Sequence, residues 1–224
     1  MRVTPVVLLF AVAPSMPGAL VSQEVTGRPG PRILLPRDQE VALARSAAPP
    51  SVHTDARVWV FTNGRYVVAD SGTSGVECYV GRGWPEALEP HCFDEEGAGS
   101  VMRMAMRRSE LLHAGTSAAA ADAEIAAGLA SGTYRLPRRP AMSWMMSSAQ
   151  VLYNDSGQRV GAWRPHVMIY FPYLSADAVG TGANNDLRAG IVVSSGTPVS
   201  NLMIVVPEAV DPAPARTTPD TGRR

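Results

Sequence analysis

The dipeptide Asn63-Gly64 separates two apolar runs, at 57–61 and 65–70. Asn and Gly both tolerate positive φ, which the two-residue type I′ turn of a β-hairpin requires. A third run, at 76–80, follows a looser turn rich in Ser and Gly. We therefore predict that the fold opens with a meander of three antiparallel strands.

The next apolar segment, at 101–106, has Met102, Met104 and Met106 at alternate positions. A period of two favours a strand there, whereas the pattern at 107–113 is helical.

The Ala-rich segment at 118–130 has the strongest helix propensity in the chain. Thr116 or Ser117 can cap its N-terminus, and Gly132 is suited to end it. Together with the helix at 107–113, this segment is predicted to form an αα-hairpin.

Three further apolar stretches complete the chain and are predicted to be strands: 142–146 continuing to 151–153, 167–171, and 191–193 with 202–206. The predicted helices lie together between two groups of strands instead of alternating with single strands. This order predicts an α+β fold, with a split or barrel-like antiparallel sheet and an inserted αα-hairpin.

The first 22 residues resemble a secretory signal peptide, with Arg2, an apolar run at 6–13, and small residues up to a cleavage site near Ser22. A run of about eight apolar residues is too short to span a bilayer, and no later run approaches about 18 residues. We expect an exported protein, periplasmic or extracellular, with no transmembrane segment in the mature chain.

Composition divides the rest of the chain into three parts. Residues 23–50 contain many prolines and are predicted to be a partly ordered linker, with a short helix over 38–45. Residues 51–210 have the length of one α+β domain. Residues 211–224 combine Pro, Ala, Thr and Arg, a composition typical of a disordered tail.

The charge balance disfavours nucleic acid as a partner. Removal of residues 1–22 takes away Arg2 and no acidic residue, so 20 basic and 20 acidic residues become 19 and 20. Strong binding to a phosphate backbone needs an excess of positive charge, which is missing here. Every basic residue is Arg, which favours a GC-rich bacterial genome as the source. Selection for planar, bidentate recognition of anions is the alternative explanation.

Cys78 and Cys92 are the two cysteines of the chain. In an oxidising compartment such a pair is predicted to form a disulfide, stabilising the fold by about 3 kcal/mol for a loop of about 15 residues. The bond would connect a strand to the proline-containing segment 84–94, which we expect to be an irregular loop. A metal or redox site with His91 is the alternative, although no Cys-x-x-Cys motif occurs.

His166 lies in the densest aromatic run of the chain. Alternation would put His166, Met168 and Tyr170 on one face of a strand, which either lines a pocket or packs in the core. Core packing is the interpretation we favour. If a pocket forms, the candidate ligand-binding residues are Arg164, His166, Tyr170 and Tyr173.

Two other functions remain open. In an exported hydrolase, His166 would act as general base with Asp94, His91 or Arg164 close by, although the chain lacks a Gly-x-Ser-x-Gly motif.

In a copper protein, Met102, Met104 and Met106 would supply soft thioether ligands. Met is also a common filler of apolar cores, so we predict no metal and no cofactor.

Four stretches carry a resemblance to a known family: 75–80, 84–92, 140–147 and 165–173. They are similar to a family of uncharacterised exported bacterial proteins, over roughly residues 41–207. This resemblance implies a bacterial exported domain and brings no activity with it. The preferred hypothesis is therefore a non-catalytic domain that binds an unknown small ligand or a component of the cell envelope.

Overall fold

The computed structural model describes residues 33–83, 87–151, 158, 161, 164–181 and 186–214. The predicted signal peptide and most of the predicted tail lie outside these residues. The helices are α1 (Arg37–Arg45), α2 (Pro50–His53), α3 (Glu95–Ala98), α4 (Val101–His113) and α5 (Ala118–Ala130), with 3₁₀ turns at Asp177–Val179 and Leu187–Ala189. The strands are β1 (Arg57–Thr62), β2 (Arg65–Asp70), β3 (Glu77–Gly81), β4 (Glu89–Phe93), β5 (Ala141–Met145), β6 (His166–Tyr170), β7 (Ile191–Val193) and β8 (Asn201–Val205).

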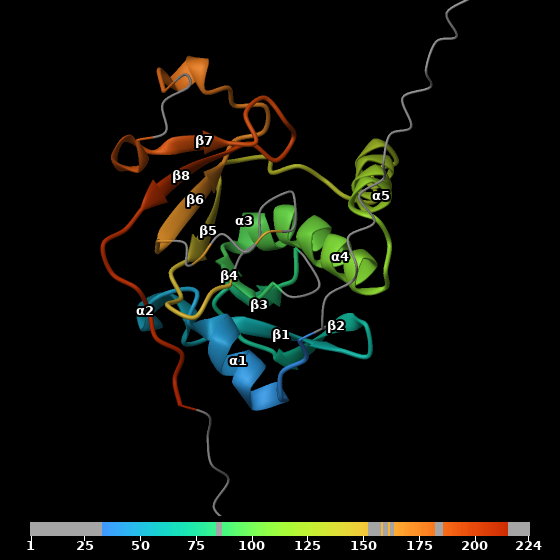
Figure 1. Cartoon of the computed structure of the whole chain (residues 1–224), viewed down its shortest axis with the longest axis vertical. Helices are drawn as coiled ribbons and strands as arrows, with labels where there is room; N and C mark the ends of the chain where they lie inside the picture. The colour runs from blue at the N-terminus through green and yellow to red at the C-terminus, as the bar shows by residue number, and fades with distance from the viewer. Residues whose placement is uncertain are drawn as a thin grey trace, which may run out of the picture.

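These strands form one eight-stranded sheet in the order β2-β1-β3-β4-β5-β6-β8-β7 (Figure 1). Its neighbouring strands are antiparallel, apart from the parallel pair β1 and β3. The α+β class is confirmed. The sheet is open, with β2 and β7 at its edges, so it is not the barrel-like or split sheet that we predicted.

The hairpin at Asn63-Gly64 is confirmed, since both residues have positive φ, 50° and 79°. The prediction of a simple meander is wrong, because β3 pairs with β1 in parallel instead of pairing with β2. The turn before β3 explains this path. The N–H groups of Thr73 and Ser74 donate to the carbonyl of Asp55, just before β1, at 2.9 and 3.1 Å. The chain therefore crosses the start of β1 and enters the sheet on its other side.

Helix α4 corrects the prediction of a strand at 101–106. Met102 and Met106 are one helical turn apart and both pack in the main core cluster. Met104 is also buried, so three buried methionines at alternate positions gave a pattern that resembles a strand. The prediction of α5 agrees with the observed helix, and the Ser117 hydroxyl accepts from Ala120 N–H as its N-cap. Helices α4 and α5 contact each other through a small apolar cluster, Leu111, Leu112 and Ala121.

Helices cover both faces of the first half of the sheet. Helices α3 and α4 lie over one face of β3 and β4, and α1 packs on β1, β3 and β4 (Figure 1). The second core cluster includes Leu43, Ala44, Ala47 and Ala48. Residues 37–48, which we expected within a partly ordered linker, are therefore part of the folded core, and the short predicted helix is α1.

A buried ion pair connects α1 to the end of β3. Arg82 Nη1 donates to Glu40 Oε1 at 2.9 Å, and both side chains are 1% exposed. The same carboxylate oxygen accepts from Phe61 N–H at 2.9 Å. The Arg82 guanidinium also lies 4.8 Å from the centre of the Phe61 ring. Glu40 Oε2 and Arg82 Nη2 are buried with no hydrogen-bond partner among the described residues, so the two buried charges depend mainly on each other for compensation.

Cys78 and Cys92 form the predicted disulfide, with their Cα atoms 4.0 Å apart. They are direct cross-strand neighbours on β3 and β4. Residues 89–93 are therefore a strand, not part of an irregular loop. Pro90 is tolerated within β4 because β5 pairs with this strand only at Cys92 and Phe93.

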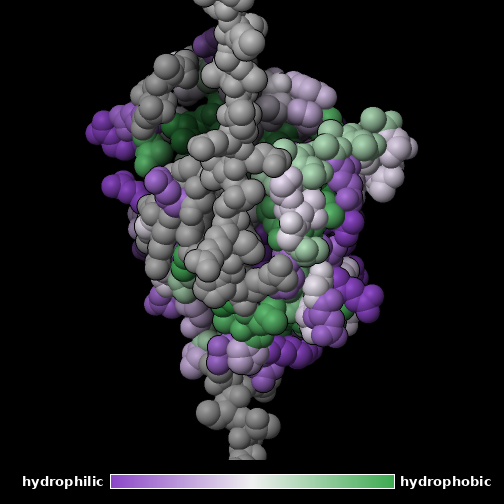
Figure 2. All heavy atoms as spheres, turned by 45° about the vertical axis from the view of Figure 1, so that its right-hand side comes forward, coloured by the Kyte–Doolittle hydropathy of each residue, from purple (hydrophilic) through white to green (hydrophobic). Residues whose placement is uncertain are grey.

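In the described ranges, the large apolar side chains that are exposed come from separate segments: Leu34, Val68, Phe171, Tyr173, Val179 and Ile204. Figure 2 shows one side of the molecule, where hydrophilic side chains surround smaller areas of apolar surface. Among the described residues, no helix combines the length and the apolar character that a membrane crossing needs.

Candidate functional site

The predicted aromatic face of β6 exists, but it belongs to the core. His166, Met168 and Tyr170 point to the same side and are 3%, 7% and 6% exposed. His166 Nδ1 lies 2.8 Å from the carbonyl oxygen of Arg164. Burial lowers the pKa of His166. This face therefore offers little accessible surface to a ligand.

The other two candidate ligand-binding residues lie apart from that face. Tyr173 is 61% exposed, with a φ of 64°, and its N–H donates to the carbonyl of Thr197 at 2.8 Å. Arg164 is also exposed. The structure thus separates the four predicted residues into two buried and two exposed side chains.

The candidate base His91 shares a sheet face with His166. His91 pairs with Tyr79, and Met145 pairs with His166. The pairing of Cys92 with Trp144 puts His91 beside Met145, so the two histidines flank that methionine. Neither ring nitrogen of His91 has a hydrogen-bond partner among the residues that the structure describes. Burial, and then the nearby His166, lower the pKa of His91 to about 3, which makes its imidazole a weak base.

The remaining predicted catalytic and metal-binding residues do not join this pair. Asp94 is the N-cap of α3 and accepts from Gly97 N–H at 2.7 Å. Met102 and Met106 share one face of α4, and Met104 lies on the opposite face, so the three thioethers do not converge on one point. Within the described part of the chain, no group of three or more His, Cys, Asp or Glu residues is arranged to hold a metal ion.

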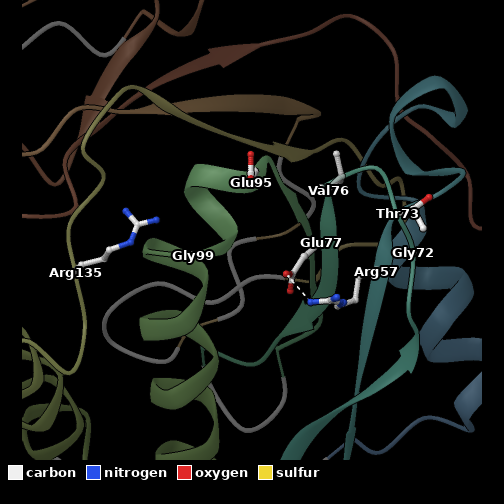
Figure 3. A pocket seen from close by; sticks show the side chains of 9 residues that line it. Arg57, Gly72, Thr73, Val76, Glu77, Glu95, Gly99 and Arg135 are labelled. Carbon is white, nitrogen blue, oxygen red and sulfur yellow. Dashed lines mark hydrogen bonds and ion pairs between the residues drawn. The ribbon is translucent and has the colours of Figure 1, made fainter.

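A groove that we did not predict lies between the turn before β3, helix α3 and the segment after α5. Its larger hollow has a volume of about 470 Å³ and is shown in Figure 3. A smaller hollow of about 200 Å³ shares Gly99 and Arg135 with it. The side chains and glycines lining the larger hollow are Arg57, Gly72, Thr73, Gly75, Val76, Glu77, Glu95, Gly99 and Arg135.

Glu77, the first residue of β3, organises one side of this groove. Its carboxylate accepts from Arg57 Nη1 at 3.2 Å, from Arg103 Nη2 at 2.9 Å and from Trp59 Nε1 at 2.6 Å. The Arg103 guanidinium also stacks 4.8 Å from the centre of the Trp59 ring. The Glu77 side chain is only 12% exposed, whereas the two arginines are 42% and 36% exposed. The carboxylate thus positions two guanidinium groups at the surface.

Glu96 has the same role on the opposite side. It accepts from Arg135 Nη1, and from Arg138 N–H at 2.9 Å. These hydrogen bonds, the one from Arg135 first, lower the pKa of Glu96. A Cβ on Gly99 would lie 2.8 Å from Arg135 Nη2, so the glycine leaves space for this guanidinium.

The rim of the groove is built closely against β1. A Cβ on Gly72 would lie 2.2 Å from the backbone nitrogen of Arg57, and Gly72 has a φ of 40°. A larger residue cannot be accommodated there without displacing the backbone. The turn that contributes Thr73 and Val76 is therefore fixed relative to Arg57.

The groove is equipped to bind an anion. Among the described residues, none accepts a hydrogen bond from Nη2 of Arg57, Nη1 of Arg103 or Nη2 of Arg135. Such guanidinium N–H groups suit carboxylate and phosphate oxygens, with which they form charge-assisted, often bidentate hydrogen bonds.

Sequence reasoning missed this site because its three arginines come from β1, α4 and the segment after α5. The use of Arg at every basic position was the one sequence signal related to it. Comparisons with protein-family models, with curated proteins and with solved structures gave no match for this chain.

Proposed function

We propose that this protein is an exported, non-catalytic domain that binds a small ligand by its anionic group, in the groove between Arg57, Arg103 and Arg135. One observation carries the proposal. A hollow of about 470 Å³ is bordered by the guanidinium groups of Arg57 and Arg135, which come from distant segments and are each oriented by a largely buried carboxylate, and Arg103 borders the smaller hollow beside it. Volumes of about 300–1,000 Å³ are usual for small-molecule sites.

The arrangement differs from an ordinary surface ion pair. Arg57 and Arg103 share the single carboxylate of Glu77, so this cluster keeps a net positive charge. The carboxylate also accepts from Trp59, which limits its freedom to turn towards solvent. A preorganised cation costs less conformational entropy on binding than a freely rotating surface arginine.

We prefer ligand binding to hydrolysis because neither His166 nor His91 is suited to act as a general base. His166 is 3% exposed, and His91 has a strongly lowered pKa. A general base must reach the proton that it removes and must have a pKa near the working pH. Neither histidine combines the two properties.

Export is supported by two independent features. The N-terminal 22 residues have the pattern of a signal peptide. The Cys78–Cys92 disulfide joins two buried strand positions, and stable disulfides are typical of proteins outside the reducing cytosol. We include in this proposal that the protein belongs to a family of exported bacterial proteins.

Isothermal titration calorimetry tests the function with the full chain, expressed with its N-terminal segment and collected from the periplasm. Small carboxylates and inorganic phosphate are compared with uncharged analogues of the same size. Binding is expected to weaken about tenfold in Arg135→Gln and to fall with added salt. Arg65→Gln is the control, because Arg65 is exposed on the edge strand β2, away from the groove.

Retained affinity in both Arg135→Gln and Arg57→Gln, with unchanged melting temperatures, would refute the proposed site. Binding to isolated envelope fractions but to no small anion would instead favour a component of the cell envelope as the partner.

A further inference from the structure

The mouth of the groove has an acidic residue whose charge the protein barely compensates. The Glu95 side chain is 82% exposed, and its nearest cation is Arg139 Nη2, 3.8 Å from Oε2. Figure 3 shows Glu95 on α3, beside the same hollow that Arg57 and Arg135 border from other elements.

The other carboxylates of the groove are already engaged. Glu77 accepts from two arginines and one indole N–H. Glu96 is bound by Arg135 and by the backbone of Arg138. Glu95 is therefore the lining carboxylate that remains able to contact a ligand, while the arginine clusters supply unused donors.

Charges of both signs at one hollow disfavour a ligand that is purely anionic. A carboxylate held by the arginines would be repelled by Glu95 unless the ligand also carried a cation. An ammonium group next to the carboxylate removes this repulsion and gains a charge-assisted hydrogen bond. Like-charge contacts within a binding site select against ligands that lack the compensating group.

We infer, on the basis of the proposed function, that the ligand is a zwitterion with an ammonium and a carboxylate, of the size of an amino acid or a short peptide. The arginines bind the carboxylate and Glu95 binds the ammonium. The hollow of about 470 Å³ is large enough for either ligand. Thr73 also lines it, and in the described part of the chain its hydroxyl has no hydrogen-bond partner.

Four probes separate the contributions of the two charges: L-alanine, L-alanyl-L-alanine, N-acetyl-L-alanine and L-alaninamide. The second probe has its charges farther apart, so it distinguishes an amino acid from a peptide ligand. N-acetylation removes the ammonium, and amidation removes the carboxylate. Each probe is titrated calorimetrically into the full, disulfide-bonded chain.

The matched variants are Glu95→Gln and Glu208→Gln. Both residues are exposed, and only Glu95 lines the groove, so neither substitution is expected to impair folding. Glu95→Gln should weaken binding of the zwitterion about tenfold and should leave the affinity for N-acetyl-L-alanine unchanged or increased. Glu208→Gln should change neither affinity.

The inference and the proposed function fail in different ways. Equal affinity for the zwitterions and for N-acetyl-L-alanine, with no effect of Glu95→Gln, would overturn the zwitterion and leave an anion-binding groove. Binding of L-alaninamide as tightly as L-alanine, or of any probe without dependence on Arg135, would overturn both.

Discussion

In the wild type, His91 and Glu89 should make the stability depend on pH in opposite directions. The replacement His91→Phe should therefore expose the contribution of Glu89. His91 and Glu89 are two residues apart on the same face of β4. Burial, together with His166, lowers the pKa of His91 to about 3. Burial raises the pKa of Glu89 to about 7, against the opposing effects of Arg108 and the Gly83 N–H.

The two groups shift the free energy of unfolding in opposite directions. Below pH 6.5 the unfolded chain protonates His91 and the folded protein does not, so stability falls as the pH falls towards 3. The folded protein keeps the Glu89 proton up to about pH 7, whereas the unfolded chain loses it above pH 4.5. The stabilisation from Glu89 is therefore complete below pH 4.5, and it is lost as the pH rises through 7. One bound proton changes stability by up to about 1.4 kcal/mol per pH unit. The totals are about 5 kcal/mol for His91 and about 3 kcal/mol for Glu89.

Between pH 4.5 and 6.5 these slopes nearly cancel in the wild type. In His91→Phe the Glu89 contribution remains, so stability relative to the wild type should decline as the pH rises through this range. In Glu89→Gln the opposite slope should appear. Urea unfolding at half-unit intervals from pH 4 to 8 measures both differences, and subtraction of the wild-type curve removes the contributions of groups that do not interact with His91 or Glu89.

His53→Gln is the matched control for loss of a histidine. His53 is partly exposed and its pKa is lowered mainly by partial burial, so its difference from the wild type should depend less on pH. A His91→Phe difference that stays constant within about 1 kcal/mol over two pH units would refute the reasoning.

Further predictions concern the buried ion pair, the rim of the groove and the disulfide. Glu40→Leu leaves the buried Arg82 charge without its carboxylate and should cost about 3–5 kcal/mol in urea unfolding; a loss below about 1 kcal/mol would contradict it. Gly72→Ala should destabilise by more than about 1 kcal/mol and weaken ligand binding, because its Cβ would meet the backbone of β1; unchanged melting and binding would contradict it. Replacing Cys78 and Cys92 together by Ala should lower stability by about 3 kcal/mol, measured without reductant; an unchanged urea midpoint would argue against this stabilisation.

Local signals in the sequence predicted the elements that depend on local chemistry. Asn63-Gly64 gave the hairpin because its φ values are a property of those two residues. The Ala-rich segment gave α5 and its Ser117 cap. The disulfide followed from two cysteines and the expected export.

The features that sequence reasoning missed depend on contacts between distant residues. The parallel pairing of β1 and β3 requires the turn before β3 to donate hydrogen bonds to the carbonyl of Asp55. The periodicity of apolar residues does not predict this contact. Met102 and Met106 fit a strand and a helix equally well until their common core neighbours are known. The groove likewise arises only when the fold brings its arginines together.

The disulfide lies close in the chain to the residues that carry the acidic side chains of the groove. Cys78 follows Glu77 directly, and Glu77 pairs across the strands with Phe93, one residue beyond Cys92. Asp94 then caps α3, the helix that carries Glu95. The covalent bond therefore connects the two strand ends from which the acidic residues of the groove extend. Formation of the disulfide thus stabilises the same strand ends that position the proposed site, so the proposed export and the proposed ligand binding are parts of one functional proposal.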